Sequence, residues 1–209
     1  MDVTLKHISD ATLRHYSENA EDFWLGTKDH DVTQNYQALL VGIGSKSTPL
    51  TLLDLGCGPG RDLMAFKAMG HEAVGLDGCA EFCDMARRRS HCEVLHQDFL
   101  DLNLPAERFD GIFANATLFH VPKADFPRVL GNLWSALKPG GILFTSNPRG
   151  SGEGFSGSRY ASYYEWEDYS DILENSGFEI LHHYYRPEGR PRAEQPWLAV
   201  VSRRGKIKS

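Results

Sequence analysis

The segment LLDLGCGPGRD, residues 52–62, places three glycines within five positions, directly behind an apolar run that carries an aspartate. Glycines between a buried strand and a helix permit unusual backbone angles and let a ligand approach the chain closely. In open sheets of parallel strands, ligands sit beyond the carboxyl ends of the strands. The segment therefore predicts a cradle for a nucleotide-type ligand.

Polar side chains stand at the ends of the next predicted strands. Asp77 ends HEAVGLDG, 21 positions after Gly56, where an acid can accept both hydrogen bonds of a ribose diol. Asp98 and Phe99 end CEVLHQDF and offer an acceptor and an apolar face to an adenine ring, and Asn115 ends the following strand. Because the carboxyl ends of parallel strands share one edge, we expect these side chains to converge on one cleft.

Two common glycine-rich motifs do not fit this turn. The dinucleotide fingerprint G-x-G-x-x-G needs a third glycine where Arg61 stands. A P-loop needs glycine, lysine and a hydroxyl residue after the strand, and no such sequence follows. A nicotinamide-dependent oxidoreductase on a similar sheet stays open as an alternative function, with Arg61 counting against it.

Strand-like and helix-like segments alternate from residue 49 onward. The predicted strands are 49–56, 71–78, 92–99, 108–116, 142–147, 178–185 and 196–202, and the predicted helices are 61–70, 81–90, 126–137 and 163–177. This alternation predicts an α/β, Rossmann-like, mostly parallel sheet with helices on both faces. The glycine- and serine-rich stretch at 147–159 predicts an irregular loop.

Residues 1–45 are expected to form an N-terminal helical appendage, and residues 46–209 the ligand-binding domain. The appendage is polar and helical in pattern, and Tyr16, Phe23 and Trp24 form an apolar stripe on one short helical segment. This stripe must bury itself against the sheet or a bound cofactor, so Tyr16 and Trp24 are candidate cofactor contacts. We expect a lid that closes over the bound ligand, and a permanently docked helix is the alternative.

Composition limits the partners. A net charge of −6 argues against nucleic acid or a membrane surface as the main partner, and no apolar stretch approaches the ~20 residues that span a bilayer. MDVTLKHISD is too polar for a signal peptide, so a cytoplasmic protein is expected. The four cysteines form no CxxC pair and the histidines are scattered, which predicts free thiols and no metal site.

The ordered set of motifs resembles the class I S-adenosylmethionine-dependent methyltransferases of the general small-molecule type. LLDLGCGPGRD is similar to their first motif, AVGLDG to their second-strand acid and QDF to their adenine-side motif. FDGIFANATLFHV is similar to their fourth strand and its loop, and LWSALKPGGILFTSN to the helix and fifth strand. The resemblance covers about residues 50 to 203 and implies a seven-stranded sheet whose last strand runs antiparallel.

The resemblance implies S-adenosylmethionine as cofactor and S-adenosylhomocysteine as product. The residues that it assigns to the cofactor site are Asp54 as a buried support, Gly56, Gly58 and Gly60 along the methionine moiety, Asp77 at the ribose, Asp98 and Phe99 at the adenine, Asn115 near the sulfonium, and also Arg61 and Gly78. A module that binds the cofactor but serves as a partner or sensor remains an alternative to an enzyme.

His120, in LFHVP just past the fourth strand, is placed to face the methyl acceptor and is the candidate base, with positioning or packing as the alternative. The family's acceptor pocket implies contributions from the appendage and from the loops after the fourth and fifth strands. The candidate acceptor residues are Phe23, Arg149, Arg159, Tyr160 and Arg186. Aromatic residues mixed with arginines suit a small acceptor that bears a carboxylate or is zwitterionic.

Overall fold

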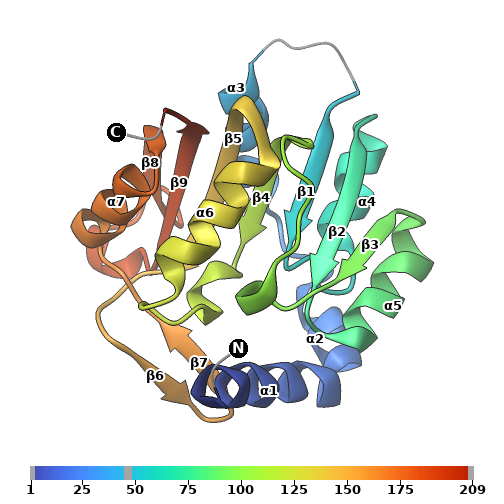
Figure 1. Ribbon diagram of the computed structural model, residues 1–209. Coiled ribbons are helices and arrows are strands. Elements are labelled where there is room, and N and C mark those ends of the chain that lie inside the picture. Colours follow the sequence, from blue (N-terminus) through green and yellow to red (C-terminus); the bar gives the residue numbers. More distant parts are fainter. Residues whose placement is uncertain (1–2, 45–48, 207–209) are drawn as a thin grey trace.

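A seven-stranded sheet lies between two layers of helices in the computed structural model, which describes residues 3–44 and 49–206 (Figure 1). The strand order is β3-β2-β1-β4-β5-β9-β8, and β9 pairs antiparallel with both of its neighbours. The strands are β1 (Thr51–Leu55), β2 (Glu72–Asp77), β3 (Glu93–His96), β4 (Phe109–Asn115), β5 (Leu137–Pro148), β8 (Phe178–Arg186) and β9 (Trp197–Arg204). The predicted sheet, with its last strand antiparallel, is confirmed.

The strand order reverses between β1, which leads into the glycine turn, and β4, which ends at Asn115. Leu53 lies beside Ile112 and Asp54 beside Phe113 in this parallel pair. The chain continues from β1 to β2 and β3 on one side, and from β4 to β5 on the other. A crevice therefore opens beyond the carboxyl ends of β1 and β4, where such folds bind their ligands.

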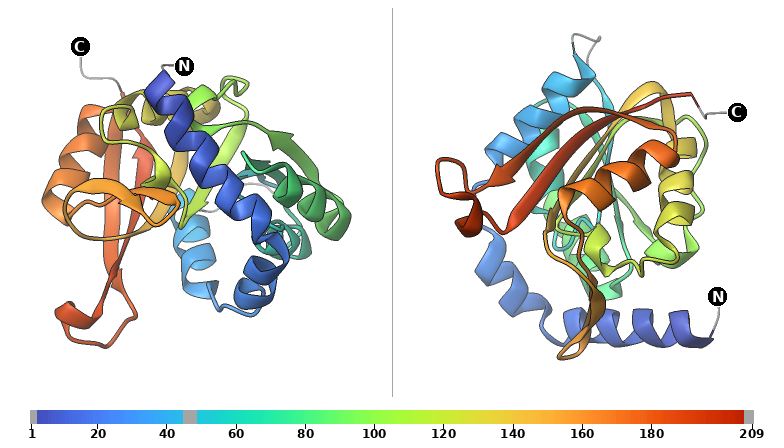
Figure 2. Two further views of the ribbon diagram at one scale, coloured as in Figure 1. Left: turned by 90° about the horizontal axis from the view of Figure 1, so that it is seen from below. Right: turned by 90° about the vertical axis from the view of Figure 1, so that its left-hand side faces the viewer.

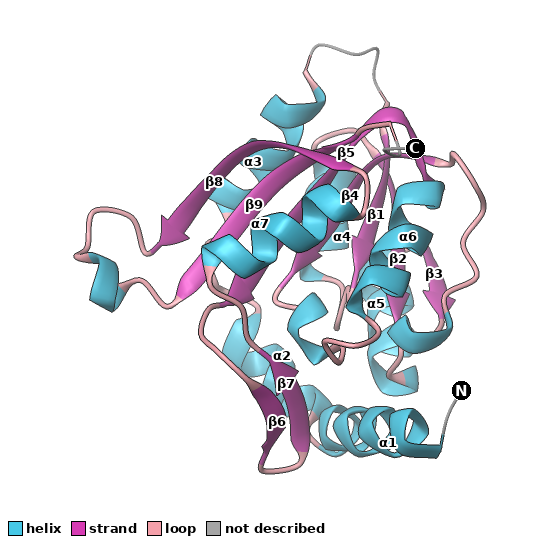
Figure 3. Ribbon diagram, turned by 60° about the vertical axis from the view of Figure 1, so that its left-hand side comes forward, coloured by secondary structure: helices cyan, strands magenta, loops and turns pink. Residues whose placement is uncertain are grey.

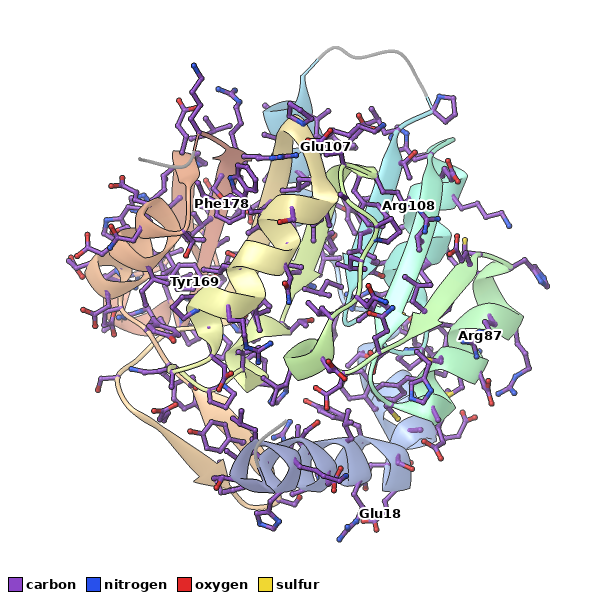
Figure 4. The ribbon with its side chains drawn as sticks, viewed as in Figure 1. Glu18, Arg87, Glu107, Arg108, Tyr169 and Phe178 are labelled. Atoms are coloured by element: carbon purple, nitrogen blue, oxygen red, sulfur yellow. The ribbon has the colours of Figure 1, made fainter. Side chains whose placement is uncertain are left out.

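Helices cover both faces of the sheet. On one face lie α6 (Phe126–Ala136) and α7 (Trp166–Asn175), and on the other α3 (Thr33–Ile43), α4 (Arg61–Ala68) and α5 (Ala80–Ser90). Figure 4 shows Tyr169 of α7 and Phe178 of β8 inside this layered core, whereas Glu18 and Arg87 point outward. The fifth predicted strand begins earlier than expected, at Leu137, because α6 already ends at Ala136.

The N-terminal segment divides into two parts. Helix α3 belongs to the sheet layers, since Leu39 is fully buried against the strands. Helices α1 (Val3–Glu18) and α2 (Ala20–Thr27) instead lie beyond the carboxyl edge of the sheet, and α1 crosses beneath it (Figure 2). The proposed boundary between residues 45 and 46 falls outside the described residues.

The apolar stripe of the N-terminal segment comes from two helices rather than one, because the first helix ends before Asn19. Tyr16 belongs to α1, and Phe23 and Trp24 belong to α2. They still gather against α5: the ring centroids of Tyr16 and Phe23 are 5.6 Å apart, and those of Phe23 and Phe82 are 5.1 Å apart. None of the helices in the described ranges is both long and apolar enough to cross a bilayer.

The expected irregular loop at residues 147–159 is wrong in its second half. A hairpin of β6 (Glu153–Ser156) and β7 (Arg159–Ser162) forms there and lies beside α1 (Figure 3). The Tyr160 amide donates a hydrogen bond of 3.0 Å to the Thr12 hydroxyl of α1. A contact with a helix almost 150 residues away in the sequence thus supports this hairpin, which the glycine-rich composition does not predict. Within the part of the chain that the structure describes, three short 3-10 turns complete the fold: Phe99–Asp101, Leu118–His120 and Arg192–Glu194.

Helix α3 offers a test of its place in the sheet layers. Leu39→Ala should lower the free energy of unfolding by about 2–5 kcal/mol, because it opens a cavity in a fully buried contact. Val41 lies on the same helix with 80% of its surface exposed, so Val41→Ala should change stability by less than about 0.5 kcal/mol. Urea unfolding measures both, and equal small effects would mean that α3 is only loosely attached.

Candidate functional site

A cavity of about 510 Å³ runs along the carboxyl edge of the sheet. Its lining extends from Asp98 after β3 to Arg186 at the end of β8, and α1 and α2 form its roof. The predicted site residues that line it are Tyr16, Phe23, Trp24, Gly56, Gly58, Arg61, Asp77, Gly78, Asp98, Phe99, Asn115, His120 and Arg186. The expected convergence of strand ends on one cleft is therefore a feature of the structure.

The turn after β1 brings the backbone close to the side chains around it. Gly56 has a left-handed φ of 73°, and a Cβ there would overlap the Thr117 side chain. Gly60, also left-handed at 97°, does not line the cavity, because its Cα faces α5, where a Cβ would come within 2.9 Å of the Ala86 Cα. Gly60 therefore packs closely against α5, and its assignment to the methionine moiety stays a prediction.

Asp77 is buried beneath the turn. Its Oδ2 accepts a hydrogen bond of 2.9 Å from the Gly58 amide, and its Oδ1 accepts one of 2.9 Å from the Cys79 amide. Burial raises the pKa of Asp77 to about 6, although these amides oppose the shift. The Gly78 amide also favours the ionised form, and the carboxylate still has a lone pair with which to accept from a ribose hydroxyl.

Arg61 ties the appendage to the start of α4. Its Nε donates to Asp62 Oδ1 at 2.7 Å, and its Nη1 donates to the Thr27 carbonyl of α2 at 3.0 Å. The Tyr36 hydroxyl of α3 donates to the same Asp62 oxygen at 2.5 Å. Beneath this group lies Asp54, which does not line the cavity. Burial, reinforced by Asp62, raises the pKa of Asp54 well above its usual value.

Both ring nitrogens of His120 are engaged. Nδ1 lies 2.7 Å from the Tyr160 carbonyl, which can only accept, so Nδ1 carries the proton. Nε2 therefore accepts from the Tyr16 hydroxyl at 2.8 Å. Burial lowers the pKa of His120 to about 4 and raises that of Tyr16, so the pair is neutral at pH 7. His120 thus links the loop after β4 to both α1 and the hairpin.

Three of the predicted acceptor residues lie away from the cavity lining. Arg149 donates to Glu165 at 2.9 Å and to the Gln195 carbonyl at 2.8 Å, so it holds segments of the C-terminal half together. The Tyr160 hydroxyl donates to Glu153 within the hairpin at 2.8 Å. The Arg159 Cζ lies 5.9 Å from the Tyr16 ring centroid, outside the cavity lining. Of the predicted acceptor residues, Phe23 and Arg186 reach the cavity.

Helix α1 supplies lining residues that the sequence analysis missed. Ser9, Thr12 and Leu13 share the inner face of the helix with Tyr16, and the Ser9 hydroxyl donates to Asp98. Positions i, i+3, i+4 and i+7 form one helical face, which is the signal that could have revealed them. The other missed lining residues are Thr27, His30, Asp31, Val32, Cys57, Pro59, Asp62, Phe82, Leu100, Ala116, Thr117 and Trp197.

The cavity lining is acidic. Four carboxylates line it, Asp31, Asp62, Asp77 and Asp98, against the guanidinium groups of Arg61 and Arg186. Such a lining favours a ligand that carries positive charge and disfavours a polyphosphate. Across residues 3–44 and 49–206, no group of three or more histidine, cysteine or carboxylate side chains is arranged to hold a metal ion.

Known proteins match this chain in sequence and in fold. Residues 52–141 match the family described as "Methyltransferase domain". Residues 52–141 are therefore similar to methyltransferase domains, and the strand order agrees with the class I methyltransferase fold.

Individual relatives are similar over part of the methyltransferase domain. A ubiquinone biosynthesis O-methyltransferase of Bradyrhizobium sp. (strain ORS 278) is 33% identical over 103 residues, which are 46% of this chain and 39% of that protein. A trans-aconitate 2-methyltransferase of Azoarcus sp. (strain BH72) is 37% identical over 101 residues, 47% of this chain and 39% of that protein. The matches thus span about two fifths of the length of these relatives.

A solved structure extends the likeness of the methyltransferase fold to most of the chain. The 1,6-didemethyltoxoflavin-N1-methyltransferase of Burkholderia thailandensis, with bound 1,6-didemethyltoxoflavin and S-adenosylhomocysteine, superposes with a TM-score of 0.75. The likeness covers 93% of this chain and 87% of that one, at 21% sequence identity.

The close approach at Gly56 can be tested by substitution. Gly56→Ala should destabilise the protein by about 2–4 kcal/mol, because it combines a strained φ with an overlap onto Thr117. Gly70 has a similar φ of 85° and open space around it, so Gly70→Ala should cost only about 1 kcal/mol. Adding Thr117→Ala should recover part of the Gly56→Ala loss in urea unfolding. Equal costs at the two glycines would show that the turn has room to spare.

Proposed function

We propose that this protein transfers the methyl group of S-adenosylmethionine to a small acceptor that bears a carboxylate or is zwitterionic. The observation that carries the proposal is the single cavity in which the glycine turn, Asp77, Asp98 and Asn115 meet at the carboxyl edge of a class I methyltransferase sheet. The named relatives act on different molecules, so the acceptor class is argued from the cavity itself.

The residues present fit this cofactor. A Cβ on Gly58 would meet only the Phe23 ring, at 3.7 Å, so the turn leaves room for a ligand against its backbone. Asp77 would bind the ribose, and Asp98 with Phe99 the adenine. The four carboxylates suit a ligand that carries an ammonium and a sulfonium. When bound, the cofactor supplies an activated methyl group, which needs alignment with the acceptor and exclusion of water more than it needs acid–base help.

The acidic lining also weighs against the nicotinamide alternative. A dinucleotide brings a pyrophosphate to the first turn, where backbone amides or cations must neutralise it. Here Arg61 already donates to Asp62 and the Thr27 carbonyl, and Asp77 lies directly beneath the turn. A turnover measurement distinguishes the proposed enzyme from a protein that binds the cofactor and serves as a partner or sensor.

Arg186 supports the choice of an anionic acceptor. It lines the cavity from the end of β8, on the opposite side of the sheet from Asp77 and Asp98. Its guanidinium makes no hydrogen bond or ion pair to another residue of the described chain, in contrast to Arg61 and Arg149. A partly buried guanidinium with free donors is a suitable partner for a carboxylate.

His120 is proposed to position rather than to remove a proton in this free form. Its Nε2 lone pair accepts from Tyr16, and its pKa of about 4 makes it a weak base at neutral pH. We infer that the Tyr16–His120 pair holds α1 over the cavity, as one part of the lid expected from the sequence.

Asp77 gives the cofactor proposal a pH signature. Hydroxyl donors favour the ionised carboxylate, so calorimetry should show S-adenosylhomocysteine binding more tightly as pH rises from 5 through about 6, by up to about tenfold, and levelling above 7. Asp77→Ala should weaken binding by about 1–3 kcal/mol and flatten this profile. In the free protein the raised pKa of Asp77 has the opposite effect on stability. Its contribution to the free energy of unfolding falls as pH rises from about 4 to about 6.

Asp84 provides the matched control for that titration. It is an exposed carboxylate on the next helix and does not line the cavity, so Asp84→Ala should bind like the unaltered protein at every pH. Thermal unfolding of each variant verifies that it is folded. Tight binding of NAD⁺ with no binding of S-adenosylhomocysteine would refute the proposal.

The acceptor class is tested at Arg186. Once mass spectrometry of reactions with cell extract has identified the methylated molecule, Arg186→Ala should raise its KM about 10–100-fold, because a charge-assisted hydrogen bond is lost, with kcat changed much less. Arg190→Ala, at an exposed position outside the lining, should leave KM unchanged. A neutral or macromolecular acceptor, or an unaltered KM in Arg186→Ala, would contradict the electrostatic argument.

A further inference from the structure

We propose that Asn35 and Tyr184 are positioning residues that turn the Asn115 side chain into a hydrogen-bond donor toward the methyl acceptor. This inference rests on the function proposed above. Neither Asn35 nor Tyr184 lines the cavity, so both act through Asn115. The three residues come from α3, β8 and β4, which the sequence separates by 80 and 149 positions.

The three side chains form one hydrogen-bonded chain. The Tyr184 hydroxyl donates to Asn35 Oδ1 at 2.9 Å, and Asn35 Nδ2 donates to Asn115 Oδ1 at 2.9 Å. Asn35 is fully buried, with 0% of its surface exposed. A buried amide with partners for both of its ends is costly to remove or to rotate, so this link is rigid.

The direction of the chain follows from its two hydrogen bonds. The Tyr184 hydroxyl, whose pKa burial raises to about 12, is protonated and donates to Asn35 Oδ1. The N–H groups of Asn35 are then left for Asn115, which presents Oδ1 to Asn35. The Nδ2 group of Asn115 makes no hydrogen bond to any residue within 3–44 or 49–206 and belongs to a side chain that lines the cavity.

The place of Asn115 in the sheet assigns this donor to the acceptor. The proposed cofactor residues follow β3, β2 and β1, on one side of β4. Arg186 and Trp197, the other lining residues of the sheet edge, belong to β8 and β9 on the far side. Asn115, at the end of β4, stands between the two groups. An N–H donor there suits an oxygen lone pair, such as one of a carboxylate that also reaches Arg186, and does not suit a sulfonium.

Removing the Tyr184 hydroxyl should free the two amides to reverse the direction of their hydrogen bond. In Tyr184→Phe, Asn35 Oδ1 loses its donor and becomes free to accept from Asn115 Nδ2, after both amides rotate. The Asn115 oxygen would then face the cavity and repel an anionic acceptor. Asn35→Asp should have the same effect more strongly, because a carboxylate at position 35 can only accept. Tyr185→Phe is the matched control, since that hydroxyl has no part in the chain.

Side-chain amide exchange, measured by NMR on the full chain without ligand, tests the hydrogen-bond direction. We expect slow exchange of the Asn35 amide protons and fast exchange of those of Asn115. In Tyr184→Phe the Asn115 protons should become protected, while Tyr185→Phe should resemble the unaltered protein. Protection of the Asn115 protons in the unaltered protein, or no change in Tyr184→Phe, would overturn the proposal.

A small flat carboxylate, benzoate, tests the functional half on protein saturated with S-adenosylhomocysteine. Benzoate should shift the Asn115 side-chain amide signal, and Tyr184→Phe and Asn115→Ala should each weaken its binding about tenfold. The double variant should bind no more weakly than Asn115→Ala, because Tyr184 acts through Asn115. Additive losses, or no benzoate-induced shift in the unaltered protein, would overturn the assignment of this donor to an anionic acceptor.

The two proposals fail in different ways. Loss of S-adenosylhomocysteine binding in the unaltered protein would refute the proposed function, whereas the exchange experiment needs no ligand. The Tyr184→Phe variant should retain S-adenosylhomocysteine binding within about twofold. A general loss of that binding in Tyr184→Phe would mark a structural role and refute positioning through Asn115.

Discussion

The site depends on how closely the chain after β1 approaches the segment after β4. Gly56 and Thr117 are in such close contact that no side chain fits between them, and this contact holds two strand ends together where the strand order reverses. The reversal opens the crevice, and the glycine turn keeps it from being filled by side chains. Asp77 reinforces the arrangement from below, because it accepts a hydrogen bond from the turn itself. A wider turn would move the ligand away from both Asp77 and the segment after β4.

Burial shapes the chemistry of the carboxyl groups at the turn. Asp54 and Asp77 are both buried under the turn, and burial raises the pKa of each. Asp62 is compensated by Arg61 and the Tyr36 hydroxyl. Of the two buried groups, only Asp77 lines the cavity. Ionising Asp77 in this buried position costs free energy, and hydroxyl donors or a cationic ligand return part of that cost when they bind. The Asp77 charge therefore favours the proposed cofactor.

The roof of the cavity is a composite of three distant segments. Helix α1 contacts Asp98 through Ser9, the hairpin through Thr12, and the loop after β4 through the Tyr16–His120 pair. Arg61 attaches α2 to the start of α4. Apolar packing adds to these hydrogen bonds, because Tyr16, Phe23 and Trp24 lie against Phe82 of α5. Helix α3 differs from this roof in that it is packed into the core of the sheet layers.

Local pattern was sufficient for the layers of the fold and for one side of the site. Continuous apolar runs indicate buried strands, and the spacing of apolar residues indicates helices. Because parallel strands share an edge, the residues that end these strands can then be placed together. Asp77, Asp98 and Asn115 were placed at the strand ends in this way, and the four-glycine stretch was misassigned because its hairpin depends on α1.

Tertiary structure alone decided which arginines are free. Arg149 and Arg186 look alike in the sequence, but a distant glutamate and two carbonyls engage the first and leave the second in the cavity. It also decided the hydrogen-bond partners of Asn35, Tyr184 and His120, because a network between residues 80 to 150 positions apart leaves no periodicity or spacing in the chain.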